Sequence, residues 1–595
     1  MIRLLRTRLT RRSGEEGFAL VIVIALSAVL MILATIAVTS SLSAQKKSST
    51  DANSAAAEAA AYAGIEEYES RLATNSSYFQ FGNPASTFST GSSLTLPTGS
   101  QANPAFGLGT TGSWASVPTV DPDGNALPST AKFRYEINTT KYLNTGVVSI
   151  RSTGLVGGTA KSIVAYVKQQ GFLDYLYFTD EEIQDPQVSG TAPASCGGGT
   201  FGSKYAWAGR STASCPIIQF APADRIQGPV HSNDTLEICG SEFDGTVTTG
   251  QPTASGGLYY AIPGGCGAAN FQQGVPTSSG IIKLPATNSA MKAQVFSDQS
   301  ATVPNPGCLF TGPTSFVWHA NGSVTVRSPW TIYTQEQGTT TLTGTKPAVC
   351  GVPGSAAGGL DTATGSTFTP NTGTVMYVQN VPTVTGDPNR WGASVPSGYH
   401  CTGANGTSTG NGIGYPTTNE SAPAGTPYGC QNGDAFVQGT LKGQYSIAAE
   451  NYVYVTGDIL YNSTATDMLG LVGNNAVWIW NPVNSSAGTI LTDSGRTVDA
   501  ALLSVAHTVQ VQNYDKGSAR GALTIDGTIA QAFRGTVATL SSGTIVTGYS
   551  KNYLYDARYH YTAPPDFLAP TTTTYGVTTW IDTPAAFKAD GSYAP

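Results

Sequence analysis

The stretch Phe18-Ala-Leu-Val-Ile-Val-Ile-Ala-Leu-Ser-Ala-Val-Leu-Met-Ile-Leu-Ala-Thr-Ile-Ala-Val38 decides the architecture of this 595-residue chain. Only Ser27 and Thr35 interrupt its apolar character, and as one helix it spans about 31 Å, the thickness of a bilayer core. Five arginines precede it and only Lys46 and Lys47 follow closely, which places the N-terminus in the cytoplasm and residues beyond 45 outside. A secretory signal peptide would have a shorter apolar region and a small-residue cleavage site. The sequence therefore predicts a single membrane-spanning helix over residues 18–38.

The residues around the start of this helix carry a family resemblance. Gly14-Glu-Glu-Gly17-Phe18-Ala-Leu-Val-Ile22 resembles the prepilin leader of type IV pilins and type II secretion pseudopilins. The resemblance implies a prepilin peptidase that cuts after Gly17 and methylates Phe18, with other pilin subunits as partners. Most members carry glutamate at the fifth mature position, where this chain has Ile22, and in this it is similar to PilX-type and GspK-type minor pilins. The GspK type sits at a filament tip, and a plain single-pass anchor is the competing interpretation.

The helix is expected to continue beyond the membrane to residue 73. Residues 51–63 are rich in alanine, and an apolar stripe of Tyr62, Ile65, Tyr68 and Leu72 recurs at steps of three or four. A small antiparallel sheet is expected to cover this stripe, with strands at 132–137, 146–150 and 162–167. Residues 74–130 are expected to be a long loop with short strands. The run at 172–178 is expected to be buried, and the acids at 179–182 to be solvated.

Composition indicates an extended β protein outside the cell. The chain has 69 glycines, only 11% charged residues and a pI near 5.3, which argues against nucleic acid as a partner. Without residues 1–17 it would keep 25 basic and 35 acidic residues, a net charge of −10.

All eight cysteines lie on the exported side of the membrane segment, and no pair has the CxxC spacing of a zinc or redox site. An even count in an oxidising compartment indicates disulfides. The sequence does not fix the connectivity, and the simplest pairing joins sequence neighbours, such as Cys196 with Cys215 and Cys401 with Cys430. The eight candidates are Cys196, Cys215, Cys239, Cys266, Cys308, Cys350, Cys401 and Cys430.

A repeat of apolar positions at offsets of six and eight residues runs through the second half of the chain. It recurs from Val230, Ile447, Leu471 and Leu503, and an apolar-x-Gly-x-apolar pattern interleaves with it. Short strands at this spacing predict rungs of a parallel β-solenoid, with an ordinary β-sandwich as the alternative. The register predicts that one set of side chains points inward and that Tyr454 and Gln510 tolerate a charge. The inward set is Val453, Val455, Val477, Ile479, Val509 and Val511.

Together these patterns predict an α+β, mainly β protein: a transmembrane pilin-like helix, a small antiparallel sheet, then a parallel β-solenoid with a disulfide-rich insertion. The expected segments are a leader at 1–17, the helix at 18–73, a pilin-like β module at 74–180, solenoid at 181–247, the insertion at 248–436, solenoid at 437–562 and a tail at 563–595. Residues 228–234 and 548–558 also resemble large bacterial pilus-associated proteins of uncharacterised function.

Residues with chemical potential are few. His231, Asp234 and Glu237 could support acid–base work or bind a metal, but a turn histidine bonded to nearby backbone is the simpler interpretation. Calcium remains open at Asp121-Pro-Asp-Gly-Asn125, although position twelve of that loop is Lys132, and at Asp458, Asp467 and Asp515, which can equally cap turns. A tyrosine cluster could stack on carbohydrate or cap the solenoid; its members are Tyr549, Tyr553, Tyr555, Tyr559 and Tyr561.

The sequence thus favours a non-enzymatic minor pilin or pseudopilin, anchored with its bulk outside the cell or built into a pilus, which displays a solenoid for adhesion or assembly. Its further partner would be a surface glycan or protein. The alternative is an envelope-anchored, carbohydrate-binding or carbohydrate-active β-helix protein. Such an enzyme should show several acids or bases on one strand row, where this chain has mainly Ser, Thr, Asn, Tyr and Gln.

Overall fold

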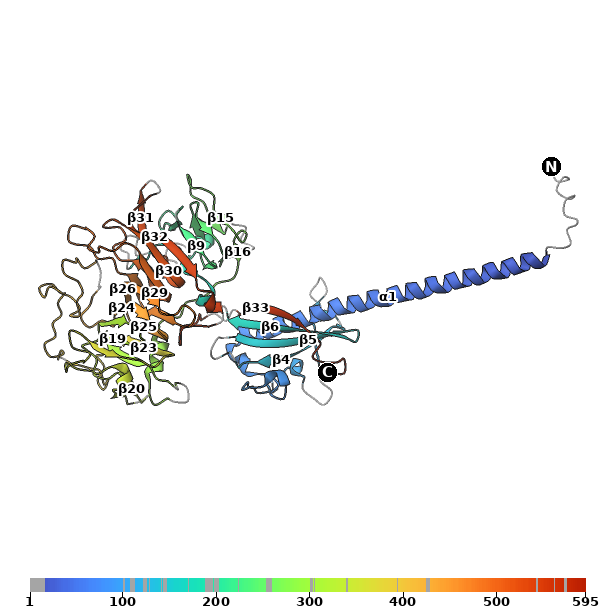
Figure 1. Cartoon of the computed structure of the whole chain (residues 1–595), viewed down its shortest axis with the longest axis horizontal. Helices are drawn as coiled ribbons and strands as arrows, with labels where there is room; N and C mark the ends of the chain where they lie inside the picture. Colours follow the sequence, from blue (N-terminus) through green and yellow to red (C-terminus); the bar gives the residue numbers. More distant parts are fainter. Residues whose placement is uncertain are drawn as a thin grey trace. The chain divides into compact units, whose positions relative to one another are not determined.

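The computed structural model describes residues 16–595 apart from short gaps at 100–101, 108–112, 121–125, 128, 141, 143–146, 170, 188–195, 197–202, 223, 253–258, 300–302, 304, 339–340, 393, 424–427, 542–543, 561, 572–574 and 595. The chain divides into a small unit, residues 1–169 with 575–595, and a large unit, residues 170–574. Figure 1 shows the long helix and the small sheet of the first unit and the many strands of the second.

The small unit is a long helix packed on an antiparallel sheet. Helix α1 spans Glu16–Thr74, and the sheet has the order β1-β4-β5-β6-β33. Its strands are β1 (Ala115–Ser116), β4 (Lys132–Asn138), β5 (Val147–Val156), β6 (Thr159–Gln169) and β33 (Tyr575–Thr583). The predicted helix and its three central strands are confirmed.

The predicted apolar stripe of the helix forms the core of this unit. Ile65, Tyr68 and Leu72 are fully buried and pack with residues of β4, β5 and β6, among them Tyr135 and Val167. Tyr62 is partly buried and meets the ring of Trp580 edge-on, with 4.7 Å between centroids. The connection after the helix holds η1 (Ser76–Gln80), η2 (Thr87–Ser89), η4 (Pro104–Phe106), β2 (Thr119–Val120) and β3 (Ala126–Leu127), as expected for a loop with short strands.

Strand β33 corrects the expectation of a C-terminal tail at 563–595. It pairs antiparallel with β6, from Tyr575 opposite Gln169 to Thr583 opposite Ser162. Both ends of the large unit therefore leave from two directly paired residues of the small sheet. In chain order, the large unit is an insertion into the hairpin formed by β6 and β33.

Parallel strands dominate the large unit, where they pair side by side in rows. The order of the strands along the longest row differs from their order in the chain. It runs β17-β23-β25-β27-β29-β30-β7-β10-β13-β16. The strands are β17 (Cys308–Thr311), β23 (Thr374–Gln379), β25 (Gln444–Ala449), β27 (Met468–Gly473), β29 (Arg496–Val511), β30 (Ala519–Phe533), β7 (Tyr177–Glu181), β10 (Val230–Ser232), β13 (Val247–Thr249) and β16 (Thr277–Ser278). The chain thus enters this row in its middle, at β7.

Two further parallel rows accompany the first. One joins β18 (Thr314–Trp318), β24 (Ala435–Leu441), β26 (Tyr452–Tyr461), β28 (Ala476–Ile479) and the end of β29. The other joins the end of β26, the starts of β29 and β30, and then β32 (Thr544–Tyr555), β9 (Arg225–Gln227), β12 (Glu242–Phe243) and β15 (Asn270–Phe271). Side chains from all three rows meet in one buried cluster.

Smaller elements complete the large unit. One short parallel sheet contains β8 (Gln219–Phe220), β11 (Leu236–Ile238) and β14 (Tyr260–Ala261). The antiparallel strands are β19 (Val324–Arg327), β22 (Ser366–Phe368) and β31 (Ala538–Ser541), with a separate hairpin of β20 (Gln335–Gln337) and β21 (Thr343–Thr345). The short helices are η5 (Phe172–Asp174), η7 (Ala206–Ala208), η9 (Ser289–Val295), η10 (Ala348–Cys350) and η11 (Ala557–His560).

Of two sequence expectations for this unit, one is not shown and the other needs correction. The sheets of the described residues do not close, so a parallel solenoid is not shown. The segment 248–436 is not set apart as an insertion, because β17, β18, β23 and β24 pair directly with one another and with β25 and β26. The clear boundary of the chain lies instead at residues 169 and 575.

The predicted register of the repeat is correct at its second and third positions, which follow the first by six and eight residues. Val453 pairs with Val477 and Val477 with Val509, and all six predicted inward side chains lie in the main cluster. The first position of the fourth repeat is shifted by one residue, because Leu471 pairs with Leu502 rather than Leu503. Leu503 accordingly packs in a different cluster on the other face.

The outward faces of these strands are also buried, which makes the predicted tolerance of Tyr454 and Gln510 wrong. Tyr454 is fully buried, in a cluster that includes Phe436 and Trp478. Residues from the long connections cover this face, among them Tyr399 and Tyr428. Gln510 is 4% exposed. A strand with both faces covered does not distinguish inward from outward positions by polarity.

All eight cysteines form disulfides, each with its sequence neighbour. The bonds are Cys196–Cys215, Cys239–Cys266, Cys308–Cys350 and Cys401–Cys430. Cys308 and Cys350 belong to the main buried cluster, where β17 begins its row. This bond therefore ties the end of the row to a connection that follows it.

We expect the removal of the bond between Cys308 and Cys350 by a double alanine substitution to lower the free energy of unfolding by about 2–4 kcal/mol, because the unfolded chain gains freedom. Denaturant titration of the purified protein measures this loss. Thiol labelling of the unreduced, unfolded wild type should find no free cysteine. Substantial labelling would contradict the disulfide assignment.

Candidate functional site

The first half of α1 is an exposed apolar surface. Val23, Leu30 and Ile36 are between 52 and 60% exposed, as are most of their apolar neighbours up to Leu42. The helix from Val23 is long and apolar enough to cross a membrane, with a mean hydropathy of 2.4 in its most apolar window. Leader residues 1–15, the surroundings of Gly17 and the side chains of Phe18 and Ile22 lie outside what the structure describes, so cleavage after Gly17 and methylation of Phe18 stay predictions.

Acidic residues at the end of β7 form a buried polar cluster, which corrects the expectation that residues 179–182 are solvated. Asp180 is 8% exposed, Glu181 3%, and Glu182 is fully buried. The segment that contains Lys204 and Arg210 supplies basic partners. Lys204 Nζ lies 2.5 Å from Asp180 Oδ2 and 3.9 Å from Glu181 Oε1.

The same segment binds Asp234, one of the predicted chemical residues. Arg210 Nη2 lies 2.6 Å from Asp234 Oδ2, and its Nη1 lies 3.8 Å from Glu181 Oε2. The backbone N–H of Ala206 donates to Asp234 Oδ1 over 2.7 Å. Two cations thus face three carboxylates. Burial raises the pKa of Glu181 to about 8, with smaller opposing effects of Lys204 and Arg210, so a proton on Glu181 balances the charges.

We expect Glu181→Gln to stabilise the protein increasingly as pH rises. The carboxyl has an ordinary pKa of 4.5, so the unfolded chain ionises above that pH while the folded chain keeps its proton up to about pH 8. The wild-type protein therefore loses folding stability as the pH rises from about 4.5 to about 8. A variant with glutamine at this position keeps that stability, because glutamine does not titrate. At pH 8 the variant should exceed the wild type by on the order of 1–3 kcal/mol, and at pH 5 by little.

Denaturant titrations at the two pH values measure this difference, with Glu237→Gln on β11 as a control. A gain that does not change between pH 5 and pH 8 would contradict the assignment of the proton to Glu181.

His231 lies on β10 within the sheet and not in a turn, and its partners are side chains. Its Nδ1 is 2.9 Å from Thr248 Oγ1, and its Nε2 is 3.1 Å from Asn233 Oδ1. Burial lowers the pKa of His231 to about 4. Glu237 belongs to a different sheet, on β11. The structure therefore places His231 in a hydrogen-bonded chain that leads through Asn233 to Asp180, and it is neutral at physiological pH.

The calcium candidates have structural partners or lie outside the described residues. Asp467 accepts the backbone N–H groups of Gly443 and Ser463, which is the turn-capping role. Asp458 pairs with Arg496 at 3.4 Å, and Asp515 is an exposed turn residue. Residues 121–125 are not described, and Lys132 begins β4. Among the described residues, no group of three acidic, histidine or cysteine side chains could hold a metal ion.

The tyrosine cluster is largely internal. Tyr549 and Tyr559 are fully buried, and Tyr553 is 3% exposed in the main cluster. Tyr555 packs against that cluster, while Tyr561 lies outside the described residues. Buried rings have no face for a sugar to stack on. Strand β32, which carries Tyr549, Tyr553 and Tyr555, pairs with β30 on one side and β9 on the other, so these three tyrosines are core residues and not a cap at the end of a row.

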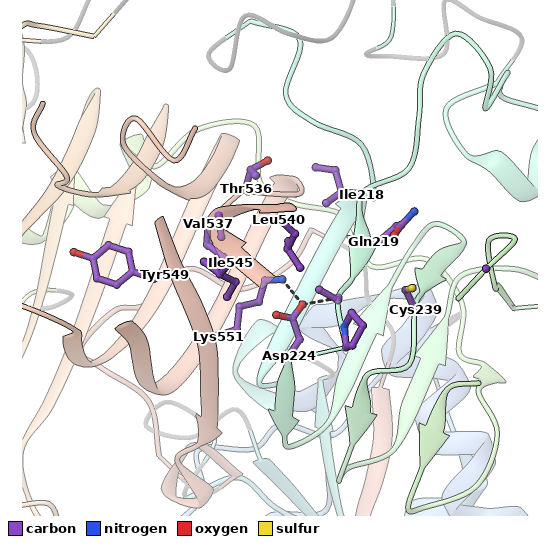
Figure 2. Close-up of a pocket in the computed structure, with 15 residues that line it drawn as sticks. Ile218, Gln219, Asp224, Cys239, Thr536, Val537, Leu540, Ile545, Tyr549 and Lys551 are labelled. Atoms are coloured by element: carbon purple, nitrogen blue, oxygen red, sulfur yellow. Dashed lines mark hydrogen bonds and ion pairs between the residues drawn. The ribbon is translucent and has the colours of Figure 1, made fainter. Parts of the chain in front are cut away.

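A groove that the sequence did not indicate lies in the large unit. It has a volume of about 610 Å³ and is lined mainly by two segments far apart in the sequence, together with Cys239 and Gly265. One contains β8 and the loop to Asp224, and the other contains the hairpin of β31 and β32. Figure 2 shows Ile218 and Gln219 on one side and Val537, Leu540 and Ile545 on the other. Most of its walls are apolar.

The groove has a charged pair at its base. Lys551 of β32 contacts Asp224, which also accepts the backbone N–H of Ala221 over 2.9 Å. Their side chains are 12% and 4% exposed. A concave, mainly apolar site with a few polar groups is typical of small-ligand sites, but these walls lack the exposed aromatic faces and rows of acids that a carbohydrate site uses.

Comparisons with known proteins leave the family open. No family model matches the chain, and no curated protein matches it. Among solved structures, the chain is similar to the competence-associated pilin ComZ from Thermus thermophilus, with 10% sequence identity over 89% of this chain and 97% of that chain, and a TM-score of 0.22.

Proposed function

We propose that this chain is a non-enzymatic minor pilin or pseudopilin-like protein of the cell surface. The observation that carries the proposal is the composition of α1: its first half is apolar and exposed, and its second half is the core of a small antiparallel unit. A helix of this kind can lie in a membrane as a single span and later pack against the helices of other subunits. The leader residues before Phe18 support the same role, with a prepilin peptidase as the processing partner.

The large unit is the part proposed for display. We propose that its three parallel rows are the faces of a solenoid, in which successive coils add strands to each row, since strands of all three rows contribute to one core. Four disulfides reinforce its connections, which suits an extracellular location. The proposed task is adhesion or filament assembly, through a surface protein or glycan.

The proposed location is the filament tip. A glutamate at the fifth mature position would lie in the membrane and needs a partner there, which the amine of a neighbouring subunit can supply. Ile22 lacks this charge, and a subunit that starts a filament has no neighbour above it. The large unit, with about 400 residues between its two attachment points, would also be hard to pack along a thin shaft.

Immunogold labelling of sheared filaments tests this proposal. With antibodies against the large unit, gold should appear at filament ends. Regular labelling along the shaft, or absence from the filament fraction, would overturn the tip assignment. Ile22→Glu should increase labelling within the shaft if the missing charge sets the position; unchanged labelling would assign the position to bulk alone.

A further inference from the structure

The pair at the base of the groove lies where two strands begin to pair. Lys551 belongs to β32, and Asp224 directly precedes β9; the next residues, Asn552 and Arg225, are register partners. Figure 2 shows the Lys551 side chain directed at the Asp224 carboxylate. The backbone therefore holds the two groups together in the folded chain, and such fixed groups react with very high effective concentrations.

The pair is buried beside an aromatic ring and a second cation. The ring centroid of Phe220 lies 5.9 Å from Lys551 Nζ and 3.6 Å from the guanidinium carbon of Arg534. Burial lowers the pKa of Lys551, and Arg534 adds to this, although Asp224 acts in the opposite direction. A buried ion pair loses much of its attraction to the cost of desolvation. A neutral product of the two groups would avoid that cost.

A second buried ion pair shares the ring of Phe220. Glu182 binds Arg534 Nη1 through Oε2 at 2.7 Å, and the Arg534 guanidinium lies over the Phe220 ring. Arg534 thus has a carboxylate partner of its own, and the ion pair of Lys551 is with Asp224.

We propose that Lys551 and Asp224 condense to an intramolecular amide, a covalent cross-link within the large unit. Lys551 Nζ transfers a proton to the Asp224 carboxylate oxygen that it contacts and attacks Asp224 Cγ, forming the N–C bond. One Cγ–O bond then breaks, and that oxygen leaves as water with two protons that began on Nζ. The third proton stays on the amide nitrogen. No atom changes oxidation state overall, and the groove gives the water a way out.

The cross-link would join two segments of the large unit that are far apart in the sequence. Its residues are separated by 327 positions; Asp224 lies next to β9, early in the unit, and Lys551 lies on β32, late in the unit. Cross-links that close long loops restrict the unfolded chain most in the entropic account. Unlike the four disulfides, this link would survive a reducing agent. It does not depend on the proposed filament role.

Mass spectrometry of the full chain in its native form tests the proposal. The intact mass should fall below that of the chain with four disulfides by one water, about 18 Da. Digestion should release a branched peptide that contains both Lys551 and Asp224. Lys551→Arg keeps the positive charge and should give the full mass with linear peptides.

The wild-type spectrum decides the question whether or not a variant folds. A full intact mass with Lys551 and Asp224 in separate linear peptides would overturn the proposal. A loss of water without the branched peptide would also overturn it, because it would place the dehydration elsewhere.

Discussion

Deletion of residues 575–595 should unfold the small unit while it leaves the large unit intact. The deletion removes β33, which pairs with most of β6, and it removes Phe587, whose ring lies 3.9 Å from the Arg134 guanidinium carbon. It also exposes the edge of β6 and the buried side chains of the unit. We expect a loss of about 5 kcal/mol or more, because it combines the removal of large buried side chains with lost sheet pairing.

Limited proteolysis and hydrogen exchange of the detergent-solubilised chain measure this effect. Peptides of β5 and β6 should lose protection, while peptides of β26 and β28 keep it. Thr579→Ala, at an exposed position of β33, is the matched control and should change little. Unchanged protection of β6 after the deletion would contradict the insertion of the large unit between β6 and β33.

Val453→Asp should destabilise the large unit by several kcal/mol. Val453 is fully buried between Ala435 and Val477 on the neighbouring strands, and all three lie in the main cluster. An aspartate there would bury a charge without a partner. Val453→Ala should cost less, because it leaves only a small cavity. The free energy of unfolding, measured by denaturant titration, separates the two.

Leu460→Asp is the matched control for this substitution. It lies on the same strand, β26, but its side chain is 37% exposed, so a charge there meets water. We expect a change within about 0.5 kcal/mol. Equal losses at residues 453 and 460 would contradict the register. Tyr454→Asp should be as damaging as Val453→Asp, because the second face of the strand is also covered.

The helix and the central strands of the small unit could be predicted because their signals are local. A stripe at steps of three or four residues identifies the helical face, and β-branched runs identify β4, β5 and β6. Strand β33 has no such local mark: it contains a register shift between Val577 and Thr579, and its partner is about 400 residues away. Pairing over such a distance leaves no pattern in either segment alone.

The strand order and the groove were missed for a related reason. Strand β18 lies in the cysteine-containing region that was expected to be a separate insertion, and its partner β24 is about 120 residues further along the chain. The acids of β7 looked solvated because their partners, Lys204, Arg210 and Arg534, come from other segments. The groove joins residues near 220 and 540, which only the folded chain brings together.

The N-terminus of the mature protein, determined by mass spectrometry on sheared surface filaments, tests the pilin-type account most directly. The account predicts a chain that begins at Phe18 with a methylated amine, and a Gly17→Val precursor that stays uncut and outside the filaments. A mature chain that begins at Met1, or beyond Val38, in cells that possess the peptidase would contradict it.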